Sequence, residues 1–121
     1  MGLDMYAFKT RHALPETDFE VPDDVELIAQ WRKHPNLHGW MQELYYERGG
    51  KGPDFDCDTL RLDLADIDAL EKVVLADQLP ETCGFFFGES LAEDKELDLA
   101  FIAAARKAIA EGYSVFYDSW W

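Results

Sequence analysis

Basic residues are scarce in this chain of 121 residues, which has 11 Lys and Arg against 25 Asp and Glu and a formal net charge of −14. Because contacts with phosphate need cations, this balance argues against direct binding to nucleic acid. The simplest role of the acidic surface is to keep the protein soluble. A more specific interpretation is that an acidic face docks on a partner protein with a basic surface.

Cysteines and long apolar runs are also scarce. Cys57 and Cys83 are the only cysteines, too few for the disulfide framework of a small secreted domain, and we expect both to be reduced. No apolar run approaches the length of a membrane span, and residues 1–6 lack the features of a signal peptide. The expected location is the cytoplasm, without membrane contact.

Apolar residues are plentiful, at 48% of the chain, and aromatic residues make up 14%. This composition predicts a single domain, residues 1–121, of α+β class. We expect a small, mainly antiparallel sheet of three to four strands, covered by about four helices. The predicted strands are 3–9, 57–62 and 113–121; the predicted helices are 25–33, a segment that starts at Pro35, 64–78 and 92–111.

Helix start signals are the clearest local patterns. Pro35 suits a first helical turn, and apolar residues follow it at helical spacing: Leu37, Trp40, Met41, Leu44 and Tyr45. Asp63 is expected to cap the helix after it, and Ser90-Leu-Ala-Glu93 matches a capping box for the last helix. The run Gly84–Gly88 is expected to be a buried strand or an extended connection.

Four segments share a pattern: Met1-Gly-Leu-Asp-Met-Tyr6, Trp31-Arg32-Lys33-x-x-Asn36-x-His38-x-Trp40, Gly84-Phe-Phe-Phe-Gly88 and Tyr117-x-Ser119-x-Trp121. Together they resemble a family of small uncharacterised proteins of bacteriophages and prophages, across the whole chain. Its members often carry the label "phosphoglycerate kinase", yet this chain lacks a phosphate-binding Gly-x-x-x-x-Gly-Lys-Ser/Thr loop and the length of a two-domain kinase. The resemblance implies a phage context, in which small acidic proteins often bind host proteins, and it offers no catalytic residues.

A polar group around His38, with Asn36 and Trp40, is the candidate ligand-binding site. The alternative is that His38 is a core histidine with a hydrogen-bonded ring. His34 and His38 have the spacing of two metal ligands on one helix, but Pro35 keeps His34 at or before the helix start, so we expect no metal and no cofactor.

A calcium site is not expected either. Asp54-x-Asp56-x-Asp58 matches the first half of a calcium-binding loop. Thr59 occupies the position that needs Gly, however, and Ala65 the position that needs a bidentate Glu. We therefore interpret this segment as a solvated acidic loop.

No nucleophile emerges from the sequence. Ser90 lies in a Gly-Glu-Ser-Leu-Ala segment that resembles a nucleophile elbow, but no histidine follows it, and a helix cap accounts for it. Neither Cys57 nor Cys83 has a basic neighbour to lower its thiol pKa. We assign no catalytic residue.

The favoured hypothesis is a non-enzymatic acidic interaction protein, an inhibitor or nucleic-acid-mimicking decoy of a host defence or nucleic-acid-processing protein. From Asp54 to Asp98 there are 14 acidic and three basic residues. The expected partner-binding residues are Asp54, Asp56, Asp58, Asp66, Glu93, Asp94, Trp120 and Trp121. The alternatives are a small-ligand- or metal-dependent enzyme centred on His38 and a phage structural or assembly component. The sequence leaves the oligomeric state open.

Overall fold

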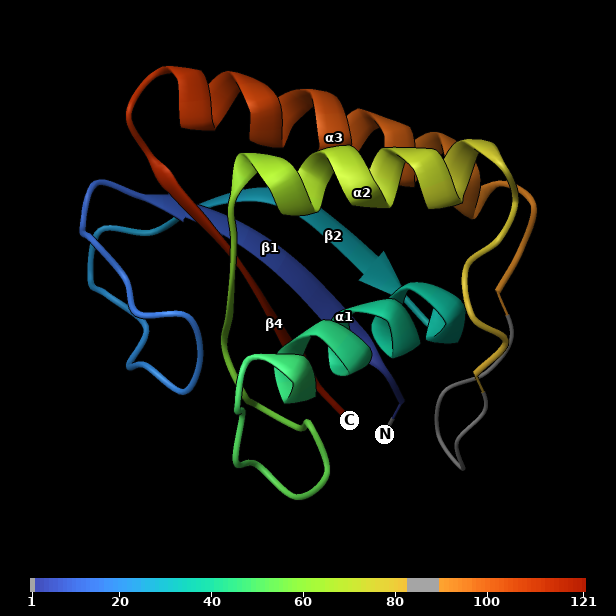
Figure 1. Ribbon diagram of the computed structural model, residues 1–121, viewed down its shortest axis with the longest axis horizontal. Helices are drawn as coiled ribbons and strands as arrows, with labels where there is room; N and C mark the ends of the chain where they lie inside the picture. Colours follow the sequence, from blue (N-terminus) through green and yellow to red (C-terminus); the bar gives the residue numbers. More distant parts are fainter. Residues whose placement is uncertain (1, 83–89) are drawn as a thin grey trace.

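A computed structural model describes residues 2–82 and 90–121 (Figure 1). Those residues form a four-stranded antiparallel sheet, in the order β2-β1-β4-β3, and three helices. The strands are β1 (Asp4–Thr10), β2 (Glu26–Arg32), β3 (Leu60–Leu62) and β4 (Ser114–Trp120); the helices are α1 (Pro35–Glu47), α2 (Leu64–Leu75) and α3 (Asp94–Ala110). The predicted α+β class and antiparallel sheet are confirmed, with three helices in the described residues rather than four.

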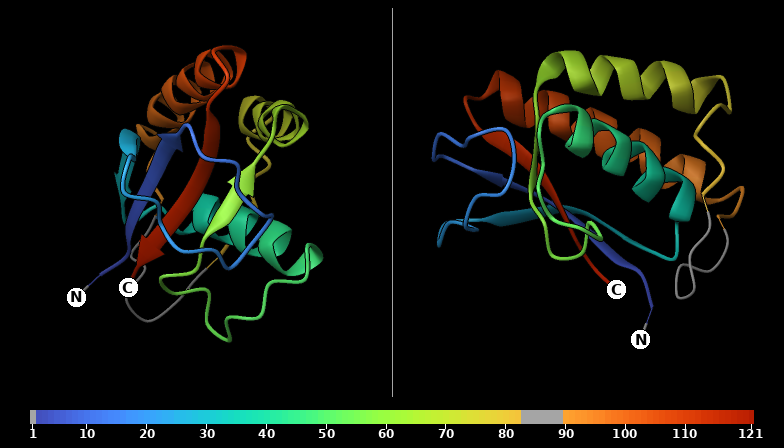
Figure 2. Two further views of the ribbon diagram at one scale, coloured as in Figure 1. Left: turned by 90° about the vertical axis from the view of Figure 1, so that its left-hand side faces the viewer. Right: turned by 60° about the horizontal axis from the view of Figure 1, so that its bottom comes forward.

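The three helices cover one face of the sheet (Figure 2). Alternate residues of the two central strands point toward them, including Met5 and Ala7 of β1 and Val115 and Tyr117 of β4, all of them fully buried. We call the opposite face, which carries no helix in the described residues, the open face of the sheet.

The open face is lined by aromatic side chains. The rings of Tyr6 and Phe8 are stacked, and Phe8 contacts Phe116 with ring centroids 5.3 Å apart. Phe19, from the loop between β1 and β2, packs edge-on against Phe116 at 5.2 Å. That loop therefore covers only part of the face.

The helix predicted at 25–33 is wrong, because Glu26–Arg32 is the edge strand β2. It pairs with β1 through Met5 opposite Trp31 and Ala7 opposite Ala29, and the register then shifts so that Phe8 faces Leu27. Ile28 is thus an extra residue, a β-bulge, and Leu27 and Trp31 point to opposite faces. The bulge disrupts the period-2 alternation that identifies a strand, and the remaining apolar spacing resembled that of a helix.

Helix α1 begins at Pro35, as predicted, and Asp63 is the N-cap of α2, also as predicted. The Asp63 carboxylate accepts the backbone N–H of Asp66 at 3.0 Å, and the Asp66 carboxylate accepts that of Asp63 at 3.0 Å. This reciprocal pair is a capping box built from two aspartates.

The capping box predicted for the last helix is not formed. Helix α3 begins at Asp94, and its N-cap, Glu93, makes no side-chain capping bond. Ser90 instead accepts the backbone N–H of Asn36 at 3.1 Å, at the start of α1. His34, the N-cap of α1, also makes no side-chain capping bond, so the Ser90 hydroxyl satisfies an amide that α1 leaves free.

Two further predictions concern chain segments near these elements. Strand β3 covers only residues 60–62 of the predicted 57–62, because Cys57 has a left-handed backbone (φ 58°) and its N–H bonds to the carbonyl of Ser119. The predicted strand or connection at 84–88 and the expected reduced state of Cys83 lie outside the described residues.

Among the helices that the structure describes, none is long and apolar enough to cross a membrane.

Candidate functional site

Three of the four sequence segments singled out above meet at one end of the sheet, where β1 begins and β2 and β4 end. Asp4 is paired with Arg32 on one side and with Trp120 on the other. The two ends of the sequence therefore lie close together, and α1 starts nearby (Figures 1 and 2). The fourth segment, 84–88, lies outside the described residues.

His38 lies in the core, with 0% of its surface exposed. Its Nδ1 atom is 2.7 Å from the hydroxyl of Tyr117, and its ring stacks on Phe55 with centroids 5.0 Å apart. Burial lowers the pKa of His38 to about 4. The ring is therefore neutral at physiological pH and sealed from any solvent-borne ligand, which removes the basis for an enzyme centred on His38.

The buried His38 predicts that stability depends on pH. The unfolded chain binds a proton near pH 6.5, whereas the folded chain does so only near pH 4. The stabilisation is complete above pH 6.5 and is lost as the pH falls toward 4, by about 3 kcal/mol. Urea unfolding across this range should show that loss in the wild type and a flatter profile in His38→Gln.

Protonation of Asp118 changes the free energy of unfolding in the opposite direction: it stabilises the folded state as the pH falls. Burial and then the charges of Asp58 and Asp56 raise its pKa to about 6, so the folded state binds this proton before the unfolded state does. Its contribution grows as the pH falls from 6 toward 4. Asp118→Asn should therefore make the wild-type loss steeper, and an unchanged profile in both variants would contradict the assignment.

Asn36 and Trp40 do not join His38 in one site. The side-chain carbonyl of Asn36 accepts the backbone N–H of Thr82 at 3.1 Å, and Asn36 lines a surface hollow. Trp40 is half-buried and lines a separate groove with Glu43 and Arg48. The predicted ligand-binding trio is thus spread over three environments.

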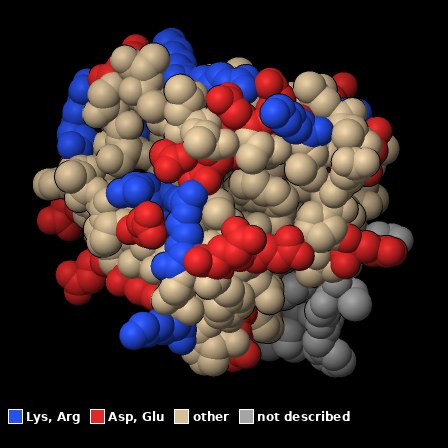
Figure 3. All heavy atoms as spheres, in the orientation of Figure 1, with Lys and Arg blue, Asp and Glu red and all other residues tan. Residues whose placement is uncertain are grey.

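The acidic residues of α2 are paired with cations. Arg48 pairs with Asp66, which is only 7% exposed, and Arg106 binds both carboxylate oxygens of Glu71 and one of Asp68, at 2.7 to 2.8 Å. Figure 3 shows acidic and basic side chains interspersed on this side of the molecule. Asp66 is therefore not available to a partner, and the helices present no continuous acidic surface there.

The two predicted partner-binding residues at the start of α3 differ from each other. Glu93 is exposed. The side chain of Asp94 is only 13% exposed and accepts the backbone N–H of Leu91 at 2.7 Å. Only Glu93 is placed to meet a partner.

Carboxylates without a basic partner gather near the chain end. Asp56, Asp58 and Asp118 form what we call the acidic cluster; within the described residues none of them forms an ion pair. Burial and then repulsion from Asp58 and Asp56 raise the pKa of Asp118, whereas burial and then repulsion from Asp18 and Asp56 raise that of Asp58. Asp54, exposed on the same loop, adds to the negative potential at Asp58.

Trp120 and Trp121 lie beside this cluster. Trp120 is 64% exposed, and it shares the open face with Asp118, two residues before it on β4. Trp121 is half-buried; its backbone N–H bonds to Asp56 at 2.9 Å and its indole N–H to the carbonyl of Phe55 at 3.2 Å. The two indoles therefore differ: Trp120 faces solvent, and Trp121 ties the chain end to the acidic loop.

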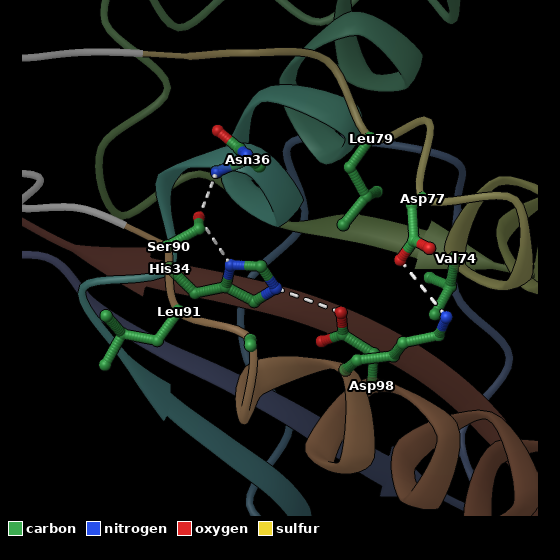
Figure 4. A pocket seen from close by; sticks show the side chains of 10 residues that line it. His34, Asn36, Val74, Asp77, Leu79, Ser90, Leu91 and Asp98 are labelled. Atoms are coloured by element: carbon green, nitrogen blue, oxygen red, sulfur yellow. Dashed lines mark hydrogen bonds and ion pairs between the residues drawn. The ribbon is translucent and has the colours of Figure 1, made fainter.

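A third group of polar residues was missed as a unit by the sequence. Ser90 Oγ lies 2.7 Å from His34 Nδ1, and His34 Nε2 lies 3.0 Å from Asp98 Oδ2 (Figure 4). The other oxygen of Asp98 accepts the indole N–H of Trp31 at 3.0 Å. We call Ser90, His34 and Asp98 the relay.

One sequence signal pointed to this relay. Asp98 precedes Phe101, Ile102 and Ala105 at helical spacing, so it occupies the buried stripe of α3, where a carboxylate needs a buried partner. Which histidine would supply that partner depended on the fold.

Two further expectations concern metals and thiols. Within residues 2–82 and 90–121, no three His, Cys, Asp or Glu side chains are arranged to hold a metal ion. Cys57 is a free cysteine at an exposed position; partial burial of its sulfur, and then the charges of Asp56 and Asp118, raise the thiol pKa. It therefore lacks the electropositive surroundings of a reactive thiolate.

Comparison with protein-family models returned no match, and comparisons with curated proteins and with solved structures returned none either.

Proposed function

We propose that the protein acts by binding a partner protein with a basic surface, through Trp120 and the acidic cluster. The observation that carries the proposal is the 64% exposure of Trp120 on the open face, beside carboxylates that no basic residue of the described chain neutralises. Exposed tryptophans are over-represented among the residues that dominate binding energy at protein interfaces. A large indole left in solvent next to unpaired charge suits an interface.

The electrostatics of the cluster indicate the chemistry of the partner. Ionisation of Asp118 is opposed by its burial and by Asp58 and Asp56, and this holds its pKa at about 6. A Lys or Arg of the partner would offset both effects. Binding is then expected to weaken at high salt and as the pH falls below about 6.

The shape of the surface next to Trp120 favours insertion of a partner side chain. A small hollow of about 190 Å³ is lined by Gly2, Asp4, Arg32, Trp120 and Trp121. Arg32 and Asp4 form an ion pair at 3.7 Å on its rim. The hollow gives the interface a depression, and the indole beside it gives the interface a ridge.

Trp120→Ala is predicted to weaken binding by roughly 30-fold or more, the effect of a central interface tryptophan. Tagged protein is incubated with nuclease-treated bacterial lysate at low and high salt, and the bound protein is identified by mass spectrometry and then titrated directly. Leu75→Ala is the matched control, because Leu75 is 57% exposed on α2, on the helix side of the sheet. Equal affinities of the two variants would contradict the proposed surface.

The resemblance to phage proteins leads us to propose further that the partner is a host protein that handles or defends nucleic acid, with the acidic cluster competing for its basic groove. Displacement of the partner by added DNA supports this. The alternative, an assembly component, predicts a different result. The chain would then self-associate in sedimentation experiments, and Trp120→Ala would not reduce the amount of any captured protein.

A further inference from the structure

The relay forms the floor of a hollow on the helix side of the molecule, away from the open face. The hollow has a volume of about 460 Å³ and lies between the start of α1, the end of α2 and the start of α3 (Figure 4). Pockets that hold small molecules span roughly 300 to 1,000 Å³. The hollow therefore has room for a small organic molecule.

Hydrogen bonding defines which atom of His34 can act as a base. The carboxylate of Asp98 accepts hydrogen bonds, so the Nε2 atom of His34, 3.0 Å away, carries the proton and donates it. In the neutral ring Nδ1 is then an acceptor, and the Ser90 hydroxyl, at 2.7 Å, donates to it. A nucleophile bonded to a base, which a carboxylate orients, is the arrangement of serine acyl-transfer sites.

The burial of the three residues suits such a site, in which the carboxylate and the base are enclosed and the nucleophile can be reached. Asp98 is 1% exposed and His34 is 3% exposed, whereas Ser90 is half-buried at the hollow. The indole N–H of Trp31 binds the second oxygen of Asp98 at 3.0 Å, so the carboxylate and the imidazole are both held in place. A carboxylate of Asp94 lies 3.6 Å from His34 Nδ1, too far for a hydrogen bond, but near enough to stabilise an imidazolium.

The amino end of α1 adds positive potential at the same hydroxyl. The backbone N–H of Asn36 points at Ser90 Oγ from 3.1 Å, and the first turn of α1 carries no acidic residue. The positive end of the helix dipole therefore faces Ser90 Oγ, the oxygen that gives up its proton when it attacks the ester.

We propose that Ser90 is the nucleophile of an acyl-transfer site that cleaves carboxylic esters with a short apolar acyl chain. This activity is separate from the proposed partner binding. The apolar walls of the hollow, formed by Val74, Leu79 and Leu91, fit the acyl chain. Chain order does not oppose the assignment, because His34 precedes Ser90 and such sites occur in several sequence orders.

The reaction balances with water as the only co-reactant. Ser90 Oγ bonds to the acyl carbon while His34 Nδ1 takes the hydroxyl proton, and the ester C–O bond then breaks as the leaving alcohol takes that proton. A water molecule attacks the acyl carbon in the same way, which releases the carboxylic acid and restores the Ser90 hydroxyl. Ser90 and His34 are the catalytic residues; Asp98 is a positioning residue.

The test uses a small alkyl fluorophosphonate, which loses fluoride to a nucleophilic serine, and p-nitrophenyl butyrate as the ester. The wild type should gain a single adduct on the peptide that contains Ser90 and should release nitrophenol. Ser90→Ala should gain none, and His34→Gln should react at least about 100-fold more slowly. Ser114→Ala, in β4, is the matched control and should react like the wild type.

The pH dependence of the wild-type rate keeps the test decisive if His34→Gln fails to fold. A rate that rises with pH through deprotonation of one group supports His34 as the base, and a flat rate overturns it. An unlabelled wild type, or a Ser90→Ala variant that reacts as fast as the wild type, would overturn the site. Trp120→Ala should leave labelling unchanged, so that the two proposals succeed or fail separately.

Discussion

Replacing Asp98 with alanine is expected to lower the free energy of unfolding by about 3 to 5 kcal/mol. The Asp98 carboxylate is 1% exposed and accepts hydrogen bonds from Trp31 and His34, both of which are also buried. Alanine leaves these two donors without an acceptor in a place where water cannot replace it. Chemical denaturation, followed by tryptophan fluorescence, measures the loss.

Asp77→Ala is the matched control for this variant. The side chain of Asp77 is 77% exposed and forms a surface ion pair with Lys95, so its removal should cost no more than about 1 kcal/mol. Asp98→Asn should fall between the two, because an amide oxygen still accepts from Trp31 while the charge that holds His34 is lost. If Asp98→Ala were as stable as Asp77→Ala, the relay would not be formed in solution.

Phe55→Ala is expected to cost a similar amount, about 3 to 5 kcal/mol. Phe55 is fully buried although it lies in a loop, and its ring centroid is 5.0 Å from that of His38, 4.7 Å from that of Tyr45 and 5.8 Å from that of Tyr117. Removal of the ring leaves a cavity among three aromatic side chains. The same denaturation experiment measures the effect.

The loss should extend to the acidic loop, because the carbonyl of Phe55 accepts the indole N–H of Trp121. Hydrogen exchange of that indole should therefore speed up in Phe55→Ala. Phe55→Leu refills much of the cavity and should cost clearly less, and Val21→Ala, at an exposed loop position, should cost under about 0.5 kcal/mol. A Phe55→Ala variant as stable as Val21→Ala would show that the loop is not anchored by this ring.

Elements governed by local chemistry were predictable from the sequence. Pro35 and the apolar spacing after it identified the start of α1, and Asp63 identified the start of α2, because both signals depend on the backbone groups of one turn. The antiparallel sheet was expected as the simplest arrangement of a few short strands covered by helices. These features need no knowledge of what the elements contact.

Features that depend on neighbours were not predictable in the same way. Leu27 and Trp31 are four residues apart, which fits one face of a helix, but the bulge at Ile28 turns them to opposite faces of the sheet, and the bulge is visible only in the pairing with β1. Ser90 matched a capping box, yet its hydroxyl binds His34 and the start of α1, which lie more than fifty residues earlier. Local rules rank such alternatives, and tertiary contacts decide between them.

In the candidate site, too, the sequence identified the residue types, but their neighbours depended on the fold. Acidic residues could be counted from the sequence, but Arg48 and Arg106 neutralise some of them from other elements, whereas Asp118 joins the acidic cluster from β4. Trp120 and Trp121 were named together as partner-binding residues, and the fold separates them into one exposed ring and one anchored ring.

The position of β4 in the sheet has a consequence for biosynthesis. This strand lies between β1 and β3, but it follows every other strand and helix in the sequence. On the ribosome, β1 and β2 can form no more than a hairpin, and β3 has only a single bridge to Thr17 until residues 114–120 have emerged. Until those residues emerge, the rings that pack on β4, such as Phe8 and Phe55, lack that partner, and the sheet is joined only when β4 pairs with the distant β1.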